Sequence, residues 1–185
     1  MTNTKILGAI FAATFVLVFS SYMSSQPSFA QTDTNGGTIQ CNTSPPNRGV
    51  FLTVDGMNGP NGSPCAFEIK NFSFSVENPT TIGSATGGAG AGKIKFNDFT
   101  IKRTVDSASP LFFQKCATGE HYPKVTLTMR KAGGDPSSAG TPFLTYTFGT
   151  VFTTKIDWSG PGDEGPEESI TFVYGDLAVD YHPPK

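Results

Sequence analysis

Charged side chains are scarce in this sequence. Lys, Arg, Asp and Glu make up 15% of its 185 residues, and 13 basic residues stand against 15 acidic ones. Without a basic excess the chain lacks the charge that holds a phosphate backbone, so nucleic acid is excluded as an expected partner. Three cysteines cannot build the dense disulfide framework of a small secreted scaffold. Phenylalanine, in contrast, is abundant, and 16 residues suffice for the core of one domain.

The sequence also lacks the groups from which catalytic sites are usually built. Its two histidines, His121 and His182, stand in no recognisable motif, and no G-x-S-x-G pattern provides a nucleophile. Four acidic residues lack the spacing of a calcium-binding loop and are interpreted as a solvated acidic turn: Asp163, Glu164, Glu167 and Glu168. The chain is therefore expected not to be an enzyme and to use no metal ion or cofactor.

A glycine-rich stretch at residues 87–93 resembles the phosphate-binding loop G-x-x-x-x-G-K. Ile94 stands where Ser or Thr would bind magnesium, and a strand pattern follows in place of the required helix. The stretch is therefore interpreted as a flexible loop that contacts a partner, and not as a nucleotide-binding site.

The first thirty residues have the pattern of a secretory signal peptide. Lys5 provides the positive charge, and residues 6–19 form an almost wholly apolar run that is too short to span a bilayer. Cleavage is expected between Ala30 and Gln31, which would leave a secreted protein, extracellular or at the cell surface, with no membrane partner. An N-terminal anchor that is never cleaved is the alternative interpretation.

Residues 31–49 are polar and are interpreted as a flexible N-terminal arm before a domain at residues 50–185. The three cysteines allow three single-bridge pairings. A Cys41–Cys65 disulfide is favoured because both residues lie in polar segments near the first strand, and it would pin the arm to the domain. Cys116 is interpreted as a buried thiol. The alternative is that all three thiols stay reduced.

Alternating apolar residues with turn signals between them predict seven or eight strands. The alternation slips in phase at three places, as in strands that bulge or change sheet: Lys70-Asn71, Asn97-Asp98 and Gly175-Asp176. Gly149 separates two further apolar runs within residues 143–158.

Residues 107–117 predict the one helix, with Pro110 near its start and Gly119 as its C-terminal stop. The expected fold class is mainly β: a small antiparallel β-barrel or sandwich with one flanking α-helix.

Several segments in order resemble the Hcp family, the haemolysin-coregulated tube proteins of type VI secretion systems. The helix and the Arg130-to-Gly134 stretch are the most specific parts. The similar segments are residues 51–56, 72–75, 87–99, 105–111, 116–121, 125–134 and 167–174.

This resemblance implies a β-barrel with a flanking helix, hexameric rings that stack into tubes, no catalytic residues, and cargo protein in the lumen. It also implies that a glycine-rich loop at about residues 78–92 reaches a neighbouring subunit or ring. The candidate loop residues are Thr80, Gly83, Gly87, Gly88, Gly90 and Gly92.

One feature departs from the family, because Hcp proteins of contractile machines are made without a signal peptide. The chain is therefore interpreted as a secreted structural protein that self-assembles into rings outside the cytoplasm. One alternative is a secreted monomeric binding module for a glycan or protein partner, with Trp158 and exposed tyrosines on its binding face. Another keeps the type VI role and treats the apolar start as a misassigned start codon.

Overall fold

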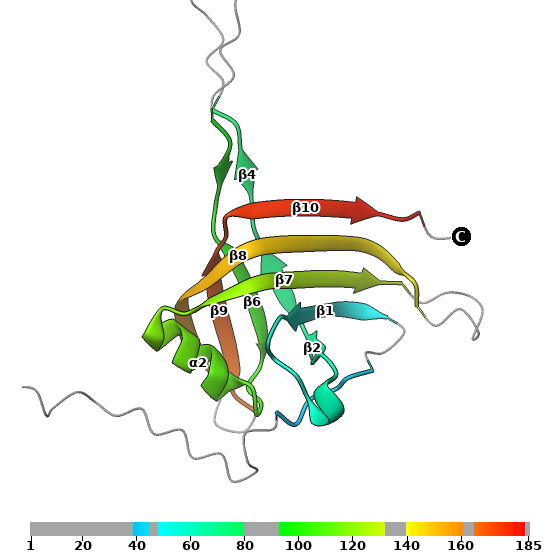
Figure 1. Ribbon diagram of the computed structural model, residues 1–185, viewed down its shortest axis with the longest axis vertical. Coiled ribbons are helices and arrows are strands. Elements are labelled where there is room, and N and C mark those ends of the chain that lie inside the picture. The colour runs from blue at the N-terminus through cyan, green and yellow to red at the C-terminus, as the bar shows by residue number, and fades with distance from the viewer. Residues whose placement is uncertain (1–38, 45–47, 80–92, 132–139, 161–164, 184–185) are drawn as a thin grey trace, which may run out of the picture. The chain divides into compact units, whose positions relative to one another are not determined.

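The computed structural model describes residues 39–44, 48–79, 93–131, 140–160 and 165–183 (Figure 1). The predicted signal peptide with its Ala30–Gln31 cleavage site, most of the predicted arm and the loop from Thr80 to Gly92 lie outside these residues. Ten strands are formed: β1 (Gly49–Val54), β2 (Phe67–Glu68), β3 (Asn71–Ser73), β4 (Val76–Glu77), β5 (Lys95–Phe96), β6 (Phe99–Thr104), β7 (His121–Arg130), β8 (Pro142–Ser159), β9 (Glu167–Val173) and β10 (Asp176–Tyr181).

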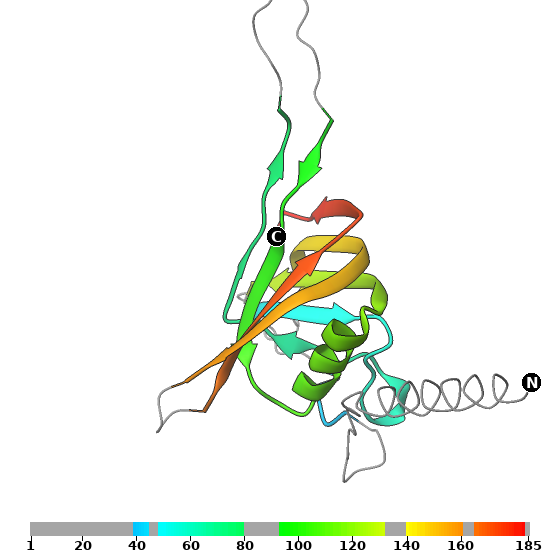
Figure 2. The same ribbon diagram turned by 90° about the vertical axis from the view of Figure 1, so that its left-hand side faces the viewer.

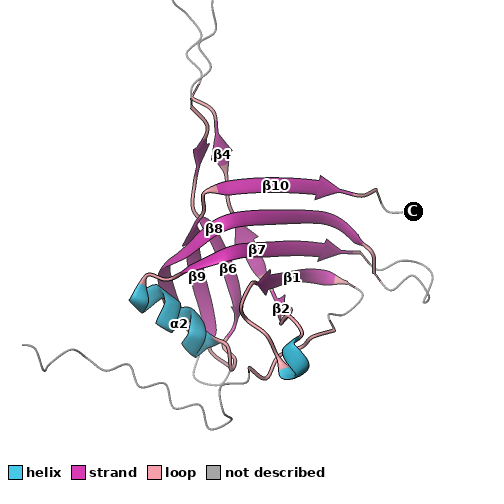
Figure 3. Ribbon diagram, viewed as in Figure 1, coloured by secondary structure: helices cyan, strands magenta, loops and turns pink. Residues whose placement is uncertain are grey.

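One α-helix, α2 (Ser109–Thr118), and one 3-10 turn, η1 (Pro60–Gly62), complete the described elements (Figure 3). All strand pairs are antiparallel, so the predicted mainly β class with one flanking helix is confirmed. Within the described residues, no helix is long and apolar enough to cross a membrane.

The main sheet has the strand order β2-β1-β7-β8-β9-β6-β3, and β10 also pairs with β8. It folds over on itself at the long strand β8. The first half of β8 pairs with β7 and β10, whereas its second half pairs with β9. β6 and β9 therefore cross behind β1, β7 and β8, as Figure 1 shows. This is an orthogonal sandwich whose corner strand belongs to both layers.

The corner of the sandwich lies at Gly149 and Thr150. Thr150 has a φ of +50°, a left-handed conformation that a β-branched residue rarely adopts, and the Gly175 N–H donates to the Gly149 carbonyl at 3.0 Å. The sequence predicted a break at Gly149, but β8 runs through it as one bent strand. The two ends of the sheet, β2 and β3, do not pair, so the sandwich is open and the barrel alternative is not realised.

The predicted phase slips coincide with places where one strand ends and the next begins in another part of the sandwich. Before Lys70-Asn71 the chain pairs with β1, and after it β3 pairs with β6 in the other layer. At Asn97-Asp98 the chain passes from the β4–β5 hairpin into β6. At Gly175 it passes from β9 to β10, and both pair with β8. Each slip therefore marks a place where side chains must change the face that they bury.

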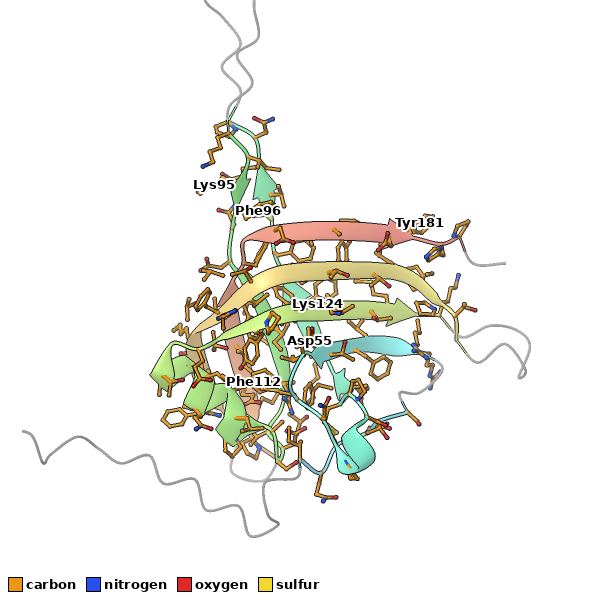
Figure 4. All side chains as sticks on the ribbon, in the orientation of Figure 1. Asp55, Lys95, Phe96, Phe112, Lys124 and Tyr181 are labelled. Carbon is orange, nitrogen blue, oxygen red and sulfur yellow. A yellow bond between two sulfur atoms is a disulfide. The ribbon has the colours of Figure 1, made fainter. Side chains whose placement is uncertain are left out.

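Helix α2 begins two residues later than predicted, because Ser107 donates to the Gln40 carbonyl and does not cap the helix. It ends at Gly119, which has a φ of +70° and donates its N–H to the Lys115 carbonyl, as the predicted glycine stop requires. Phe112 is fully buried against the sheet (Figure 4). Cys116 is only half-buried, so its prediction as a buried thiol is wrong.

Candidate assembly surfaces

The first layer of the sandwich is formed by β2, β1, β7, the first half of β8 and β10, and the second layer by the second half of β8 with β9, β6 and β3. The inner face of the first layer becomes progressively less covered toward β10. Three rows of apolar side chains cross β1, β7, β8 and β10 in register: Val54, Val125, Phe148, Leu177; Leu52, Leu127, Tyr146, Val179; and Val50, Met129, Leu144, Tyr181. On β10 the side chains are half-buried at Leu177 but 56% exposed at Val179 and 62% exposed at Tyr181.

The cause of this gradient is the size of the second layer. Phe74 contacts both Phe148 and Tyr146, with ring centroids 5.4 and 4.9 Å apart, so the second layer covers the near rows. Tyr181 lies beyond the rows that Phe74 covers, at the far end of β10 (Figure 4). We call the least covered part of these rows the β10 stripe, which consists of the exposed Val179 and Tyr181 with the half-buried Met129 and Leu144 beside them.

The β10 strand also has backbone N–H and C=O groups that are available for pairing with another strand. Among the described strands it pairs only with β8, so its other edge is open for strand pairing. Natural edges are usually blocked by charged side chains or covered by another segment. Here Asp176 and Asp180 alternate with apolar residues and lie on the opposite face of β10 from the stripe.

A second projecting feature is the β4–β5 hairpin, which extends away from the sandwich (Figure 2). Its stem is held by Asn97, whose side-chain amide donates to Ser75 at 2.9 Å and to Glu77 at 2.6 Å. Val76 and Ile94 are 42% and 52% exposed on the stem. This stem carries the predicted assembly loop, whose own residues lie outside the described ranges.

Below α2 the structure contains a buried ion pair that the sequence did not predict. Arg103 on β6 lies opposite Glu168 on β9, with Nε 3.5 Å from Oε1, and both residues are 1% exposed. Glu168 also accepts hydrogen bonds from Ser109 at 2.8 Å and from the Trp158 indole at 3.1 Å. A second carboxylate, that of Asp106, pairs with Nη2 of Arg103.

This cluster corrects the prediction of a solvated acidic turn. Glu168 is a core residue, whereas its neighbour Glu167 is partly exposed and pairs with Lys70 at 2.6 Å. The Lys70 ammonium, through this hydrogen bond and its charge, holds the pKa of Glu167 below its ordinary value. Asp163 and Glu164 lie outside the described residues.

The N-terminal arm is joined to the sandwich by a disulfide. Cys41 and Cys65 form the bridge with Cα atoms 5.5 Å apart, and Cys65 is fully buried. Ile39, two residues before Cys41, is 5% exposed and packs in the core. The end of the predicted arm is thus part of the folded domain.

The two histidines lie beside different parts of β8. His121 pairs with Phe152 on β8 and His182 with Phe143, nine residues away along the same strand. They therefore lie on opposite sides of the bend of β8 at Gly149 and Thr150. The described ranges contain no cluster of His, Cys, Asp and Glu that could hold a metal ion. Burial raises the pKa of the Tyr122 and Tyr174 phenols, which are core residues.

Trp158, the candidate for a glycan face, is 51% exposed beside Phe113, with ring centroids 6.0 Å apart. A cleft of about 430 Å³ lies between these rings and the start of α2 at Pro110. The Trp158 indole N–H donates a hydrogen bond to the Glu168 carboxylate, so the buried ion pair fixes the orientation of the ring.

Comparison with known proteins identifies the fold and its family. A family described as "Type VI secretion system effector, Hcp" matches residues 51–181. Protein Hcp1 of Pseudomonas aeruginosa is 34% identical over 94 residues, which cover 50% of this chain and 56% of that protein. The match therefore spans little more than half of the curated relative.

Two solved structures share the fold. A structure of a type six secretion system protein has a TM-score of 0.61 at 22% identity, covering 72% of this chain and 83% of its own. The crystal structure of Hcp1 from Salmonella typhimurium has a TM-score of 0.56 at 23% identity, covering 71% and 85%.

Proposed function

The chain belongs to the Hcp family of type VI secretion system effectors, and from this membership we propose that it is an exported protein that self-assembles into hexameric rings. The family is one of structural tube proteins, so the chain is a structural protein and not an enzyme. Its proposed principal partner is a further copy of itself, and stacked rings would leave a lumen in which a cargo protein could lie.

The observation that carries this proposal is the β10 stripe beside an open strand edge. An open edge strand with an exposed apolar face is prone to association, and the two charged residues of β10, Asp176 and Asp180, lie on its other face. Val179 and Tyr181 provide apolar area, and the outer edge of β10 provides unpaired backbone groups. Pairing that edge with a different surface of a neighbouring copy, repeated around a closed ring, would bury the stripe and satisfy the backbone groups of β10.

The β4–β5 hairpin supports contacts in a second direction. Its stem projects from the sandwich and exposes Val76 and Ile94, which supports a contact between this hairpin and a neighbouring ring. We propose that the loop residues from Thr80 to Gly92 make this contact. The export step rests on the signal-like N-terminus, and the disulfide is of the kind that persists in oxidising compartments.

Electron microscopy with light scattering tests the proposal. The purified protein should form rings with the mass of six copies, and Val179→Lys with Tyr181→Lys should reduce it to a monomer. Ala178→Lys is the matched control, because Ala178 lies on the opposite face of β10 and is exposed. A wild-type protein that stays monomeric at high concentration would refute ring assembly and favour the binding-module alternative, with the Trp158 cleft as its first candidate site.

A further inference from the structure

The described end of the N-terminal arm covers one edge of the sheet. β2 is the last strand of the first layer, and the N–H of Ile69, the residue after β2, donates back to the Val50 carbonyl of β1. Ala66 lies three residues earlier, so its N–H points away from β1. That N–H donates to the Asn42 carbonyl of the arm at 2.8 Å. The arm thus occupies the outer side of β2.

Few other contacts hold the arm in place. The Ser107 hydroxyl donates to the Gln40 carbonyl at 2.8 Å, and Ile39 is inserted into the core. A pocket of about 370 Å³ remains between arm residues Gln40 to Asn42 and the β1–β2 surface at Phe51 and Phe67. The arm therefore rests on the sheet at a few points and leaves space between them.

The disulfide is the strongest of these attachments, and the surrounding loop is shaped around it. A Cβ atom on Gly59 would lie 2.7 Å from the Cys41 sulfur, so only glycine permits the loop to pass this close to the bridge. Of the two sulfur-bearing residues, Cys65 is fully buried and Cys41 is half-buried. A reductant therefore reaches the bridge from the side of Cys41.

We propose that the Cys41–Cys65 bridge is a redox latch that keeps the arm on the outer side of β2, and that its reduction frees that edge for pairing with a strand of a second copy. A dithiol reductant supplies two electrons and two protons: the S–S bond is replaced by two cysteine thiols, and the sulfurs of the reductant join in a disulfide. This inference concerns the β2 edge and does not depend on ring assembly through β10.

Cleavage at Arg48 tests the latch directly. The chain has three arginines, and an arginine-specific protease should cut after the exposed Arg48, because Arg103 is buried and Arg130 is half-buried in β7. In oxidised protein the cut arm should remain attached through the bridge. After dithiothreitol it should elute separately, and hydrogen exchange at Ala66 should rise by about tenfold or more while that at Leu127 is unchanged.

The latch would be refuted if the cut arm stayed bound after reduction, or if exchange at Ala66 did not change. A Cys41→Ser, Cys65→Ser variant should show the fast exchange without any reductant. Cys116→Ser is the matched control, since it removes the remaining thiol and should leave both results as in the wild type. If the double variant does not fold, reduction of the folded wild type still decides the question. Light scattering of the reduced protein then reports whether the freed edge associates.

Discussion

The buried pair between Arg103 and Glu168 should make a large contribution to stability, and Glu168→Ala is the variant that tests it. The substitution removes the carboxylate that pairs with Nε of Arg103 inside the core. It also leaves the hydroxyl of Ser109 and the indole of Trp158 without their acceptor. Arg103 stays buried above the rings of Phe67 and Phe112, at 4.6 and 5.3 Å, and its one remaining carboxylate partner, on Asp106, lies at the surface.

The expected cost follows from this geometry. Removing one partner of a buried ion pair typically destabilises a protein by about 3–5 kcal/mol, because the other charge is left without compensation. For a domain of this size each kcal/mol lowers the melting temperature by about 2–4 °C, so we expect Glu168→Ala to melt about 10 °C below the wild type. Replacing both charges, as in Arg103→Met with Glu168→Leu, should recover most of this loss.

Urea unfolding of the wild type, Arg103→Met, Glu168→Leu and the double variant measures the coupling energy between the two residues. Glu167→Ala is the matched control, because it removes a neighbouring carboxylate whose partner Lys70 lies at the surface. The reasoning is wrong if Glu168→Ala unfolds within about 1 kcal/mol of the wild type, or if the effects of the single variants add in the double variant.

Three further predictions test the other features. Tyr181→Lys alone should weaken self-association measured by sedimentation, because it places a charge on the β10 stripe. The Lys70–Glu167 pair should stabilise the fold fully above pH 4.5, the ordinary pKa of the carboxyl, and this contribution should fall away as the pH drops through the lowered pKa of Glu167; NMR titration should show that pKa return toward 4.5 in Lys70→Met. Gly59→Ala should lower the fraction of protein that carries the bridge, counted by thiol titration, because the new Cβ would collide with the Cys41 sulfur.

The strands could be predicted from sequence because burial alternates along them, and the phase slips located the points where the chain changes layer. Gly119 was also recognisable, since its position after an apolar helical pattern favours a left-handed stop. The continuity of β8 through Gly149 could not be predicted, because a glycine that ends a strand and one that bends it look the same in sequence. Whether the inner face of β10 is covered depends on the extent of the second layer, which no local pattern encodes.

The sequence contains a signal for the Arg103–Glu168 pair in the alternation of the two strands. Glu168 is in phase with Ile170 and Phe172, and Arg103 is in phase with Phe99 and Ile101, so both charges occupy inward positions of their strands. The run of acidic residues before Ile170 hid this phase and suggested a solvated turn. An inward charge on one strand therefore predicts an opposite inward charge on its neighbour, since neither can be buried alone.

The two edges of the first layer differ in a way that favours directed assembly. The family match begins at residue 51, so the arm residues from Ile39 to Ser44 precede the matched segment and add a cover to the β2 edge. At the other end of the same layer, β10 has no such cover among the described residues. A closed ring of more than two copies needs two different complementary surfaces on each copy. If the latch holds the β2 edge shut in an oxidising compartment, the β10 edge must pair with a surface other than β2, and reduction should change the form of the assembly and not only its stability.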